Sequence, residues 1–255
     1  MLVAERRGGV LVATLARPPV NAIDAALLAR LDALVAQAEA DESIALLHLR
    51  SAQRAFCAGA DLALMRACFV ERETESMVAL VRAMQRVFAR IERAPFATLA
   101  EIGGAALGGG LELALACDLR VAAHDAKLGL PEIALGLLPA AGGTQRLAAL
   151  CGPGVARRLI LGGETIDGRT ACELGLVQWA KRADDLGDFT AALAQRLAAH
   201  PRDAIAANKR CLAIAAACAD AGFAAEIDET RRLYAAPDTQ ARVAAFLERP
   251  RAASA

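Results

Sequence analysis

Apolar residues recur along this chain in short runs, and the length of each run predicts the element that it forms. The strand candidates are runs of strand length at Leu2–Arg6, Val10–Ala16, Ile44–Leu49, Phe96–Ile102 and Leu119–Ala123. The first two are joined across Gly8-Gly9, a pair that suits a tight turn, so they are predicted to form a hairpin.

Two longer segments carry their apolar residues at helical spacing instead. Asp24 is placed to cap a helix whose apolar positions are Leu27, Leu31, Leu34 and Val35. The second helix is predicted over Thr74–Ile91, with one stripe made of Met77, Leu80, Val81, Met84 and Phe88. We interpret this stripe as core packing rather than as a ligand site.

Short strands that alternate with helices predict an α/β fold. From about Asp184 no further strand candidate occurs, and Pro201 and Pro237 punctuate what reads as a run of helices. The C-terminal section is therefore predicted to be helical.

The composition of the chain indicates which kind of molecule it binds. Lys plus Arg and Asp plus Glu both number 29, which gives a net charge of +0, and aromatic residues make up only 4%. A protein that binds nucleic acid without sequence preference usually has a basic stripe and stacking aromatics, and this chain has no basic run. We expect a small-molecule substrate and no nucleic-acid partner.

Neither a metal site nor a membrane segment is expected. The three histidines, His48, His124 and His200, are isolated, and the seven cysteines include no C-x-x-C pair. No uncharged apolar run approaches the ~18 residues of a membrane span, and charged residues precede any apolar stretch at the N-terminus. The expected location is cytoplasmic.

Two segments resemble nucleotide-binding motifs only in part, and the serine hydrolase elbow G-x-S-x-G is absent. Residues 163–170 have the glycine spacing of a phosphate loop, but Arg169 replaces the lysine and the preceding segment reads as helix, so a helix–turn–helix junction is predicted. The glycines at 108–110 lack the last glycine of a dinucleotide fingerprint, because Leu113 occupies its place.

Three glycine-rich or proline-containing segments have the right composition for a catalytic site. The first follows the Ile44–Leu49 run and reads Phe56-Cys57-Ala58-Gly59-Ala60-Asp61-Leu62. Its small residues let a ligand approach the backbone, and a helix start after it would leave N–H groups unpaired. The ordinary structural interpretation is a strand-to-helix turn with Asp61 as the cap.

The second segment contains three consecutive glycines, Gly108 to Gly110, followed by Leu111 and Glu112. Glycines that open a helix are costly for stability, but they allow negative charge to sit against the helix amides. Glu112 lies among apolar neighbours, where a carboxyl should have an altered pKa. Its ordinary interpretation is a carboxylate favoured by the helix dipole.

The third segment runs from Gly129-Leu130-Pro131-Glu132 to Leu138-Pro139-Ala140-Ala141-Gly142-Gly143-Thr144-Gln145-Arg146. Taken alone, Pro131-Glu132 is an ordinary helix start. Taken together, the three segments offer two backbone-donor loops and two partly buried carboxyls. These are the groups needed to stabilise an oxyanion while protons move at adjacent carbons.

These segments closely resemble the crotonase superfamily, and its enoyl-CoA hydratase branch in particular. The resemblance runs from Arg17-Pro18-Pro19-Val20-Asn21-Ala22 to Leu174-Gly175-Leu176-Val177, with a looser match at 244–248. It implies a spiral of ββα units in residues 1–195, which hold the active site. Residues 196–255 would then form a helical section that mediates assembly into a homotrimer or hexamer.

The resemblance also implies the roles of individual residues. The N–H groups of Ala58 and Gly109 would hold the thioester carbonyl, and Ala58, Gly59, Ala60, Asp61 and Leu62 would line the coenzyme A pocket. Glu112 and Glu132 would position a water and move the protons. Coenzyme A would enter only as part of the acyl-CoA substrate, with no permanently bound cofactor.

The predicted activity is hydration of 2-trans-enoyl-CoA to 3-hydroxyacyl-CoA. Two alternatives stay open: an enoyl-CoA isomerase, which can work with one carboxyl, and a relative that binds coenzyme A or RNA without turnover. One departure from the family pattern is Ala140, which stands where glycine is common and adds a methyl group near the expected water.

Overall fold

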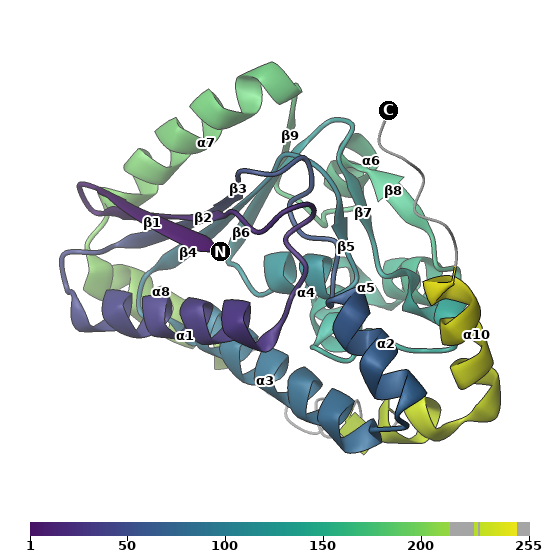
Figure 1. The fold of residues 1–255 in the computed structure, drawn as a ribbon. Coiled ribbons are helices and arrows are strands. Elements are labelled where there is room, and N and C mark those ends of the chain that lie inside the picture. The colour runs from purple at the N-terminus through teal and green to yellow at the C-terminus, as the bar shows by residue number, and fades with distance from the viewer. Residues whose placement is uncertain (215–226, 229, 249–255) are drawn as a thin grey trace.

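A computed structural model describes residues 1–214, 227, 228 and 230–248 of the chain. Its main sheet has the strand order β1-β2-β3-β4-β6-β9 (Figure 1). β1 and β2 form an antiparallel hairpin, and the remaining neighbours are parallel. The strands are β1 (Leu2–Arg7), β2 (Val10–Leu15), β3 (Leu46–Ser51), β4 (Ala97–Ile102), β6 (Leu119–Ala123) and β9 (Trp179–Lys181).

A smaller sheet of order β5-β7-β8 stands beside the main one. Its strands are β5 (Ala106–Leu107), β7 (Lys127–Gly129) and β8 (Thr165–Asp167). Helix α4 (Gly109–Leu115) follows β5 directly, and all seven of its residues are buried. A glutamate placed on this helix is therefore held inside the protein.

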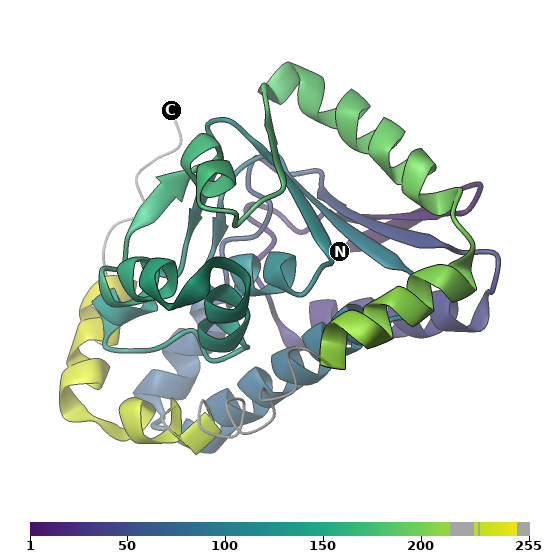
Figure 2. The ribbon, with the colours of Figure 1, turned by 180° about the vertical axis from the view of Figure 1, so that it is seen from behind.

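Helices cover both faces of the main sheet (Figures 1 and 2). α7 (Ala183–Ala198) contacts β3, β4 and β6 on one face. α1 (Ala25–Ala40), α3 (Thr74–Arg93) and α8 (Arg202–Ile214) lie on the opposite side. The apolar stripe of α3 is buried, as predicted, but its interpretation as core alone is incomplete, because Met77, Leu80, Val81 and Met84 also line the cavity described below.

The remaining helices surround the smaller sheet and the end of α3. They are α2 (Leu62–Val70), the 3-10 helix η1 (Pro131–Leu135), α5 (Gly143–Leu161), α6 (Gly168–Glu173) and α10 (Pro237–Leu247). α10 contacts both α2 and η1. The C-terminal section thus packs against elements from the middle of the sequence.

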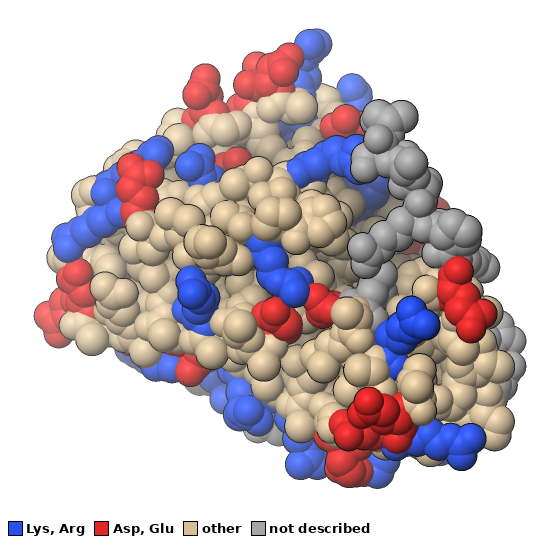
Figure 3. All heavy atoms as spheres, viewed as in Figure 1, with Lys and Arg blue, Asp and Glu red and all other residues tan. Residues whose placement is uncertain are grey.

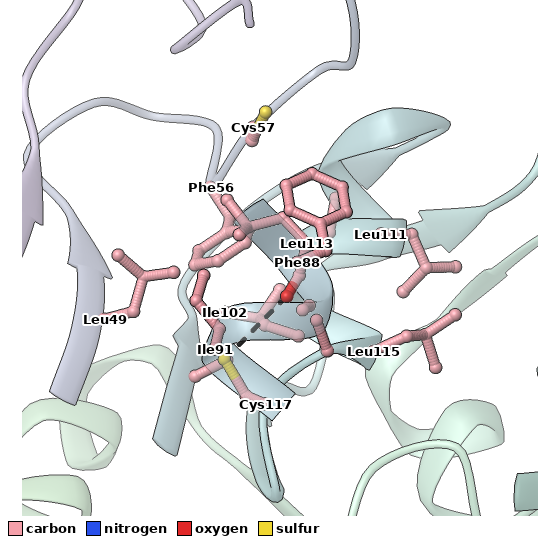
Figure 4. Packing of buried hydrophobic residues seen from close by; sticks show 14 of the residues in the cluster. Leu49, Phe56, Cys57, Phe88, Ile91, Ile102, Leu111, Leu113, Leu115 and Cys117 are labelled. Carbon is pink, nitrogen blue, oxygen red and sulfur yellow. Dashed lines mark hydrogen bonds between the residues drawn. The ribbon is translucent and has the colours of Figure 1, made fainter. Parts of the chain in front are cut away.

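The core between the two sheets is built from aliphatic and phenylalanine side chains. Figure 4 shows side chains of α4 near those of α3 and of the strand ends. They belong to one buried cluster that includes Phe56, Phe88, Ile91, Ile102, Leu111, Leu113 and Leu115. This packing fixes α4 relative to the loop that precedes α2.

The α/β class and most predicted elements are confirmed, with differences at particular places. β3 begins two residues later than the apolar run, at Leu46, and ends at Ser51. The helix–turn–helix prediction for residues 163–170 is wrong, because 165–167 form β8, which pairs with β7. Pairing with a distant strand overrides the local pattern there.

The division of the chain at residue 195 stays a prediction, as does the homotrimer or hexamer. α7 runs through residue 195 and ends at Ala198, before Pro201. The predicted helical section lies partly outside the described residues, since 215–226, 229 and 249–255 are not described. What is described of it, α8, residues 230–235 and α10, is helical.

The face seen in Figure 3 carries Lys and Arg interspersed with Asp and Glu. Several charged side chains of the described residues form ion pairs, such as Arg90 with Glu39 and Arg158 with Glu164. This face presents no broad basic surface of the kind that attracts a phosphate backbone.

Candidate active site

A cavity of about 560 Å³ lies where the donor loops and the C-terminal helices meet. All three segments singled out in the sequence contribute to its lining. Its other walls are largely apolar side chains from α2, α3 and the C-terminal section. The lining comprises Ala58, Gly59, Ala60, Met65, Met77, Leu80, Val81, Met84, Leu107, Gly108, Gly109, Glu112, Pro131, Glu132, Ala134, Leu135, Leu137, Leu138, Ala140, Ala141, Thr230, Leu233, Tyr234, Ala245 and Phe246.

The N-terminal segment before α1 holds the first donor loop in shape. The side-chain amide of Asn21, which is fully buried, donates to the carbonyl of Phe56 at 2.9 Å. Ile23 N–H donates to Gly59 O at 2.8 Å, and Asp61 N–H donates to Ile23 O at 2.9 Å. The loop is thereby paired like a short strand, and its conformation does not depend on a ligand.

This pairing corrects the assignment of Ala58 as an oxyanion donor. The Ala58 N–H donates to the carbonyl of Val20 at 3.0 Å, so it is already used. Ala60 forms a parallel bridge with Ile23, but the two hydrogen bonds of this bridge are made by Gly59 O and Asp61 N–H. The N–H of Ala60 itself therefore points away from Ile23. Ala60 lines the cavity, and its N–H has no acceptor among the described residues. The structure therefore favours Ala60 as the donor of this loop.

Gly109, the second donor that the family resemblance implies, lies where its N–H can be free. It is the first residue of α4, and the first amides of a helix have no partner within the helix. The two loops touch: a Cβ on Gly109 would lie 3.7 Å from the Cα of Gly59, and one on Gly110 would lie 2.0 Å from the carbonyl oxygen of Cys57. Glycine at 110 is thus required for the close approach that brings the two donors together.

Glu112 lies one turn into α4 and is 2% exposed. Its Oε1 accepts a hydrogen bond of 2.8 Å from the backbone N–H of Gly143, the first residue of α5. A Cβ on Gly143 would lie 3.0 Å from the same oxygen. The carboxylate is therefore held at one point by a helix N-terminus and faces the cavity.

Glu132 reaches the same cavity from a different kind of element. It is the second residue of the 3-10 helix η1, which has Pro131 at its start. Its Oε2 atom is buried and has no hydrogen-bond partner among the described residues. Burial raises the pKa of this carboxyl from 4.5 to about 7, because the charged form loses its water. Its Oε1 lies against Gly108, where a Cβ would approach to 2.8 Å.

Two side chains hold the loop that precedes α5 from outside. Gln85 of α3 donates to the carbonyl of Ala140 at 2.7 Å. Arg146 donates to the carbonyl of Ala141 at 2.9 Å and pairs with Glu92 at 2.9 Å. These bonds fix the two peptide planes that lead to Gly142. The next plane, which carries the Gly143 N–H, is held by the N–H of Arg146, which donates to Gly142 O at 2.9 Å.

Most of the predicted site residues meet at the cavity. Gly59, Ala60, Gly109, Glu112 and Glu132 line it together. Asp61 caps α2 by accepting from Ala63 and Leu64, and it pairs with Arg17 at 2.6 Å. It is therefore a support of the loop. Leu62 begins α2, and its side chain lies outside what the structure describes.

Sequence reasoning missed several functional candidates. Gly143 was part of the third segment, yet nothing in its spacing indicated that its N–H would reach Glu112. Thr230 and Tyr234 line the cavity from a region with no recognisable motif. Gln85 lies on α3 beside its apolar stripe, and only the three-dimensional contact identifies it.

Among the described residues, no group of three or more His, Cys, Asp or Glu side chains is arranged to hold a metal ion. No helix in the described part of the chain is long and apolar enough to span a membrane.

Comparison with known proteins identifies the family. The sequence model of the enoyl-CoA hydratase/isomerase family matches residues 5–253. A probable enoyl-CoA hydratase of Bacillus subtilis (strain 168) is 41% identical over 190 residues, which cover 74% of this chain and 72% of that protein. The 2,3-dehydroadipyl-CoA hydratase of Escherichia coli (strain K12) is 36% identical over 250 residues, covering 97% and 96%.

Among solved structures, an enoyl-CoA hydratase from Bacillus halodurans superposes with a TM-score of 0.89 at 26% identity, covering 96% of this chain and 99% of that chain. The arrangement of the sheets and of α4 is thus shared with proteins of the crotonase fold. The chain belongs to the enoyl-CoA hydratase/isomerase family of the crotonase superfamily.

Proposed function

We propose that this protein hydrates 2-trans-enoyl-CoA to 3-hydroxyacyl-CoA. The observation that carries the proposal is the pair of carboxyls, Glu112 and Glu132, that line one cavity together with the Ala60 and Gly109 amides. An isomerase can shuttle one proton with one carboxyl, whereas the addition of water requires a proton to leave one atom and another to arrive at its neighbour.

The two amides act on the thioester oxygen. When water adds to the β-carbon, the electrons of the double bond move towards the carbonyl and the oxygen becomes negatively charged. Donors fixed before the reaction stabilise this charge without reorganisation, and each contributes about 3–4 kcal/mol to the transition state. The pairing of the Ala60 loop with residues 20–23 supplies that rigidity.

The two carboxyls divide the proton transfers. Glu112, held by the Gly143 N–H, takes a proton from the water as its oxygen bonds to the β-carbon. Glu132, whose pKa of about 7 keeps much of it protonated at neutral pH, gives its proton to the α-carbon. The enolate collapses to the thioester, and proton exchange between the carboxyls and water restores the starting state.

The names of the relatives agree with this chemistry. One is a 2,3-dehydroadipyl-CoA hydratase and another a short-chain-enoyl-CoA hydratase, at 36% and 30% identity. We further propose that coenzyme A binds only as part of the substrate, against the loop at Gly59 and Ala60, and that no cofactor stays bound.

The test is a direct assay of the purified protein. Crotonyl-CoA and longer 2-trans-enoyl-CoA thioesters should lose the absorbance of the conjugated thioester as water adds. In parallel, 3-trans-enoyl-CoA thioesters should gain no such absorbance at a comparable rate. Rapid conversion of the 3-enoyl substrates without hydration of the 2-enoyl substrates would instead establish an isomerase.

A further inference from the structure

The cavity contains a second polar site, contributed by the helix at 230–235. Apart from the two glutamates, the only polar side chains among its described lining residues are Thr230 and Tyr234. They are four residues apart in one helix, so they lie on the same face one turn apart. No reaction step proposed above uses either hydroxyl.

The hydroxyl of Thr230 is buried. Thr230 is 3% exposed, and its Oγ1 is buried without a hydrogen bond among the described residues. Buried hydroxyls are nearly always satisfied, because an unsatisfied one loses its bonds to water without compensation. An unpartnered hydroxyl in the wall of a substrate cavity indicates that the partner arrives with the ligand.

Tyr234 lines the same cavity and carries the second hydroxyl. It is 7% exposed, and its ring packs against Phe69 of α2 with 4.9 Å between ring centroids. Burial raises its pKa, and the negative charges of Cys68, Glu132 and Glu112 act in the same direction. The phenol therefore keeps its proton at any physiological pH and can donate it in a hydrogen bond.

The charge of the site limits what can bind there. No Lys, Arg or His belongs to the lining that the structure describes, and both charged residues in it are acidic. Among the described lining residues, a carboxylate on the acyl chain would meet Glu112 and Glu132 and no basic side chain. An uncharged oxygen, as in a hydroxyl, ketone or ether, would meet no like charge and can accept a hydrogen bond from Thr230 or from Tyr234.

We infer that Thr230 and Tyr234 form a specificity site for acyl chains that carry an uncharged oxygen function beyond the β-carbon. The remaining lining, with Met65, Met77 and Leu80, holds the methylene groups between that oxygen and the double bond. This inference rests on the proposed function for the identity of the substrate as an enoyl-CoA, but the hydroxyl pair itself is a property of the cavity.

The test compares three thioesters of equal length: 2-hexenoyl-CoA, 6-hydroxy-2-hexenoyl-CoA and 2-hexenedioyl-CoA. The protein should prefer the hydroxy substrate to the plain one by about tenfold in kcat/KM, the effect of hydrogen bonds formed to otherwise unsatisfied groups. The dicarboxylic substrate should be the poorest. Equal rates for the first two, or preference for the carboxylate, would overturn the inference.

Two isosteric variants assign the effect to these hydroxyls. Thr230→Val and Tyr234→Phe should each reduce the ratio of hydroxy to plain substrate several-fold. Thr239→Val is the matched control, because Thr239 is equally buried but its hydroxyl donates to Gly136 O at 3.0 Å. The control should keep the ratio. A variant that slows both substrates in proportion would assign the hydroxyls to the reaction or to the fold instead.

Binding and melting measurements keep the inference testable without turnover. Calorimetry should show tighter binding of 6-hydroxyhexanoyl-CoA than of hexanoyl-CoA, so a failure of hydration alone leaves this comparison intact. Thr230→Val should melt no lower than the unchanged protein, since it removes an unsatisfied group. A clearly lower melting temperature would mean that the Thr230 hydroxyl already has a structural role.

Discussion

The two carboxyls of the site are carried by secondary-structure elements that differ in burial and in hydrogen bonding. Glu112 is carried by α4, a helix in which every residue is buried, and its oxygen is tied to the Gly143 amide. Glu132 is carried by η1, in which no residue is fully buried, yet its Oε2 has no partner. Glu112 is tied to the start of a distant helix, whereas one oxygen of Glu132 is buried without a partner among the described residues.

This difference supports the proposed division of roles between two identical side chains. Burial raises the pKa of Glu132 and favours its neutral form, which suits a proton donor, whereas the Gly143 N–H orients Glu112 as a proton acceptor. Variants of each residue can test this division.

Replacing either carboxyl should have the largest effect. Glu112→Gln and Glu132→Gln keep the shape but cannot exchange a proton, so each should lower kcat for hydration by at least about 100-fold. The double variant should lose less than the product of the two single losses, since both groups serve one water. Steady-state kinetics with crotonyl-CoA is the measurement, and near-normal turnover by either single variant would disprove the two-carboxyl mechanism.

The effect of Glu132→Gln on stability should depend on pH. Below pH 4.5 Glu132 is protonated in both the folded and the unfolded state, but above its folded pKa of about 7 the folded protein must bury its charge. A shift of this size costs roughly 3 kcal/mol. Relative to the unchanged protein, Glu132→Gln should therefore gain that much unfolding free energy between pH 4 and pH 8.

Urea titrations at the two pH values measure this gain, with Glu112→Gln compared under the same conditions. A Glu132→Gln variant whose relative stability did not change with pH would show that Glu132 is solvated in the folded protein.

The pH profile of the reaction should reflect the same group. If Glu132 must be protonated to donate to the α-carbon, kcat/KM should fall as pH rises through about 7, with roughly a tenfold decrease between pH 6 and pH 8. The profile should be measured under conditions where the fold is intact throughout. A rate that increased over this range would assign Glu132 the role of base.

Crowding each carboxyl separately should have smaller effects. Gly143→Ala places a methyl group 3.0 Å from Glu112 Oε1, and Gly108→Ala places one 2.8 Å from Glu132 Oε1. We expect each to lower kcat about tenfold, an effect consistent with displacement of a catalytic group by a fraction of an ångström.

Matched controls exist for both glycines. Gly154→Ala lies in α5 beyond the kink at Gly152, and Gly175→Ala shares the positive φ of Gly108, yet neither new methyl group would meet an atom within 4 Å. If the controls lost as much activity as the test variants, backbone strain rather than the carboxyls would be responsible.

The smallest expected effect comes from the loop support. Gln85→Leu removes the donor to the Ala140 carbonyl and should lower kcat by about threefold, because Arg146 still holds the next carbonyl. KM for crotonyl-CoA should change little, since Gln85 itself does not line the cavity. Gln85→Glu, which cannot donate as a carboxylate, should behave like the leucine variant.

The sequence predicted those parts of the molecule that depend on local pattern. The helix over α3, the hairpin and the strand at Leu119–Ala123 follow from spacing alone, and Gly109, Glu112 and Glu132 follow from the resemblance. The local pattern could not decide whether Ala58 or Ala60 offers its N–H to the thioester. That depends on the hydrogen bond from Ala58 N–H to Val20 O, which joins residues 38 positions apart. The donor to Glu112 and the two hydroxyls also arise from contacts between distant segments.

Asn21 has a consequence for how the protein folds. It holds a left-handed backbone conformation and, from before α1, bonds to the carbonyl of a residue 35 positions later. The loop that carries Ala60 therefore cannot reach its final shape while its own neighbourhood folds, since it needs the N-terminal segment on one side and the start of α4 on the other. Loop closure over such separations slows folding. The geometry of the site therefore cannot be completed before the N-terminal segment has docked on this loop.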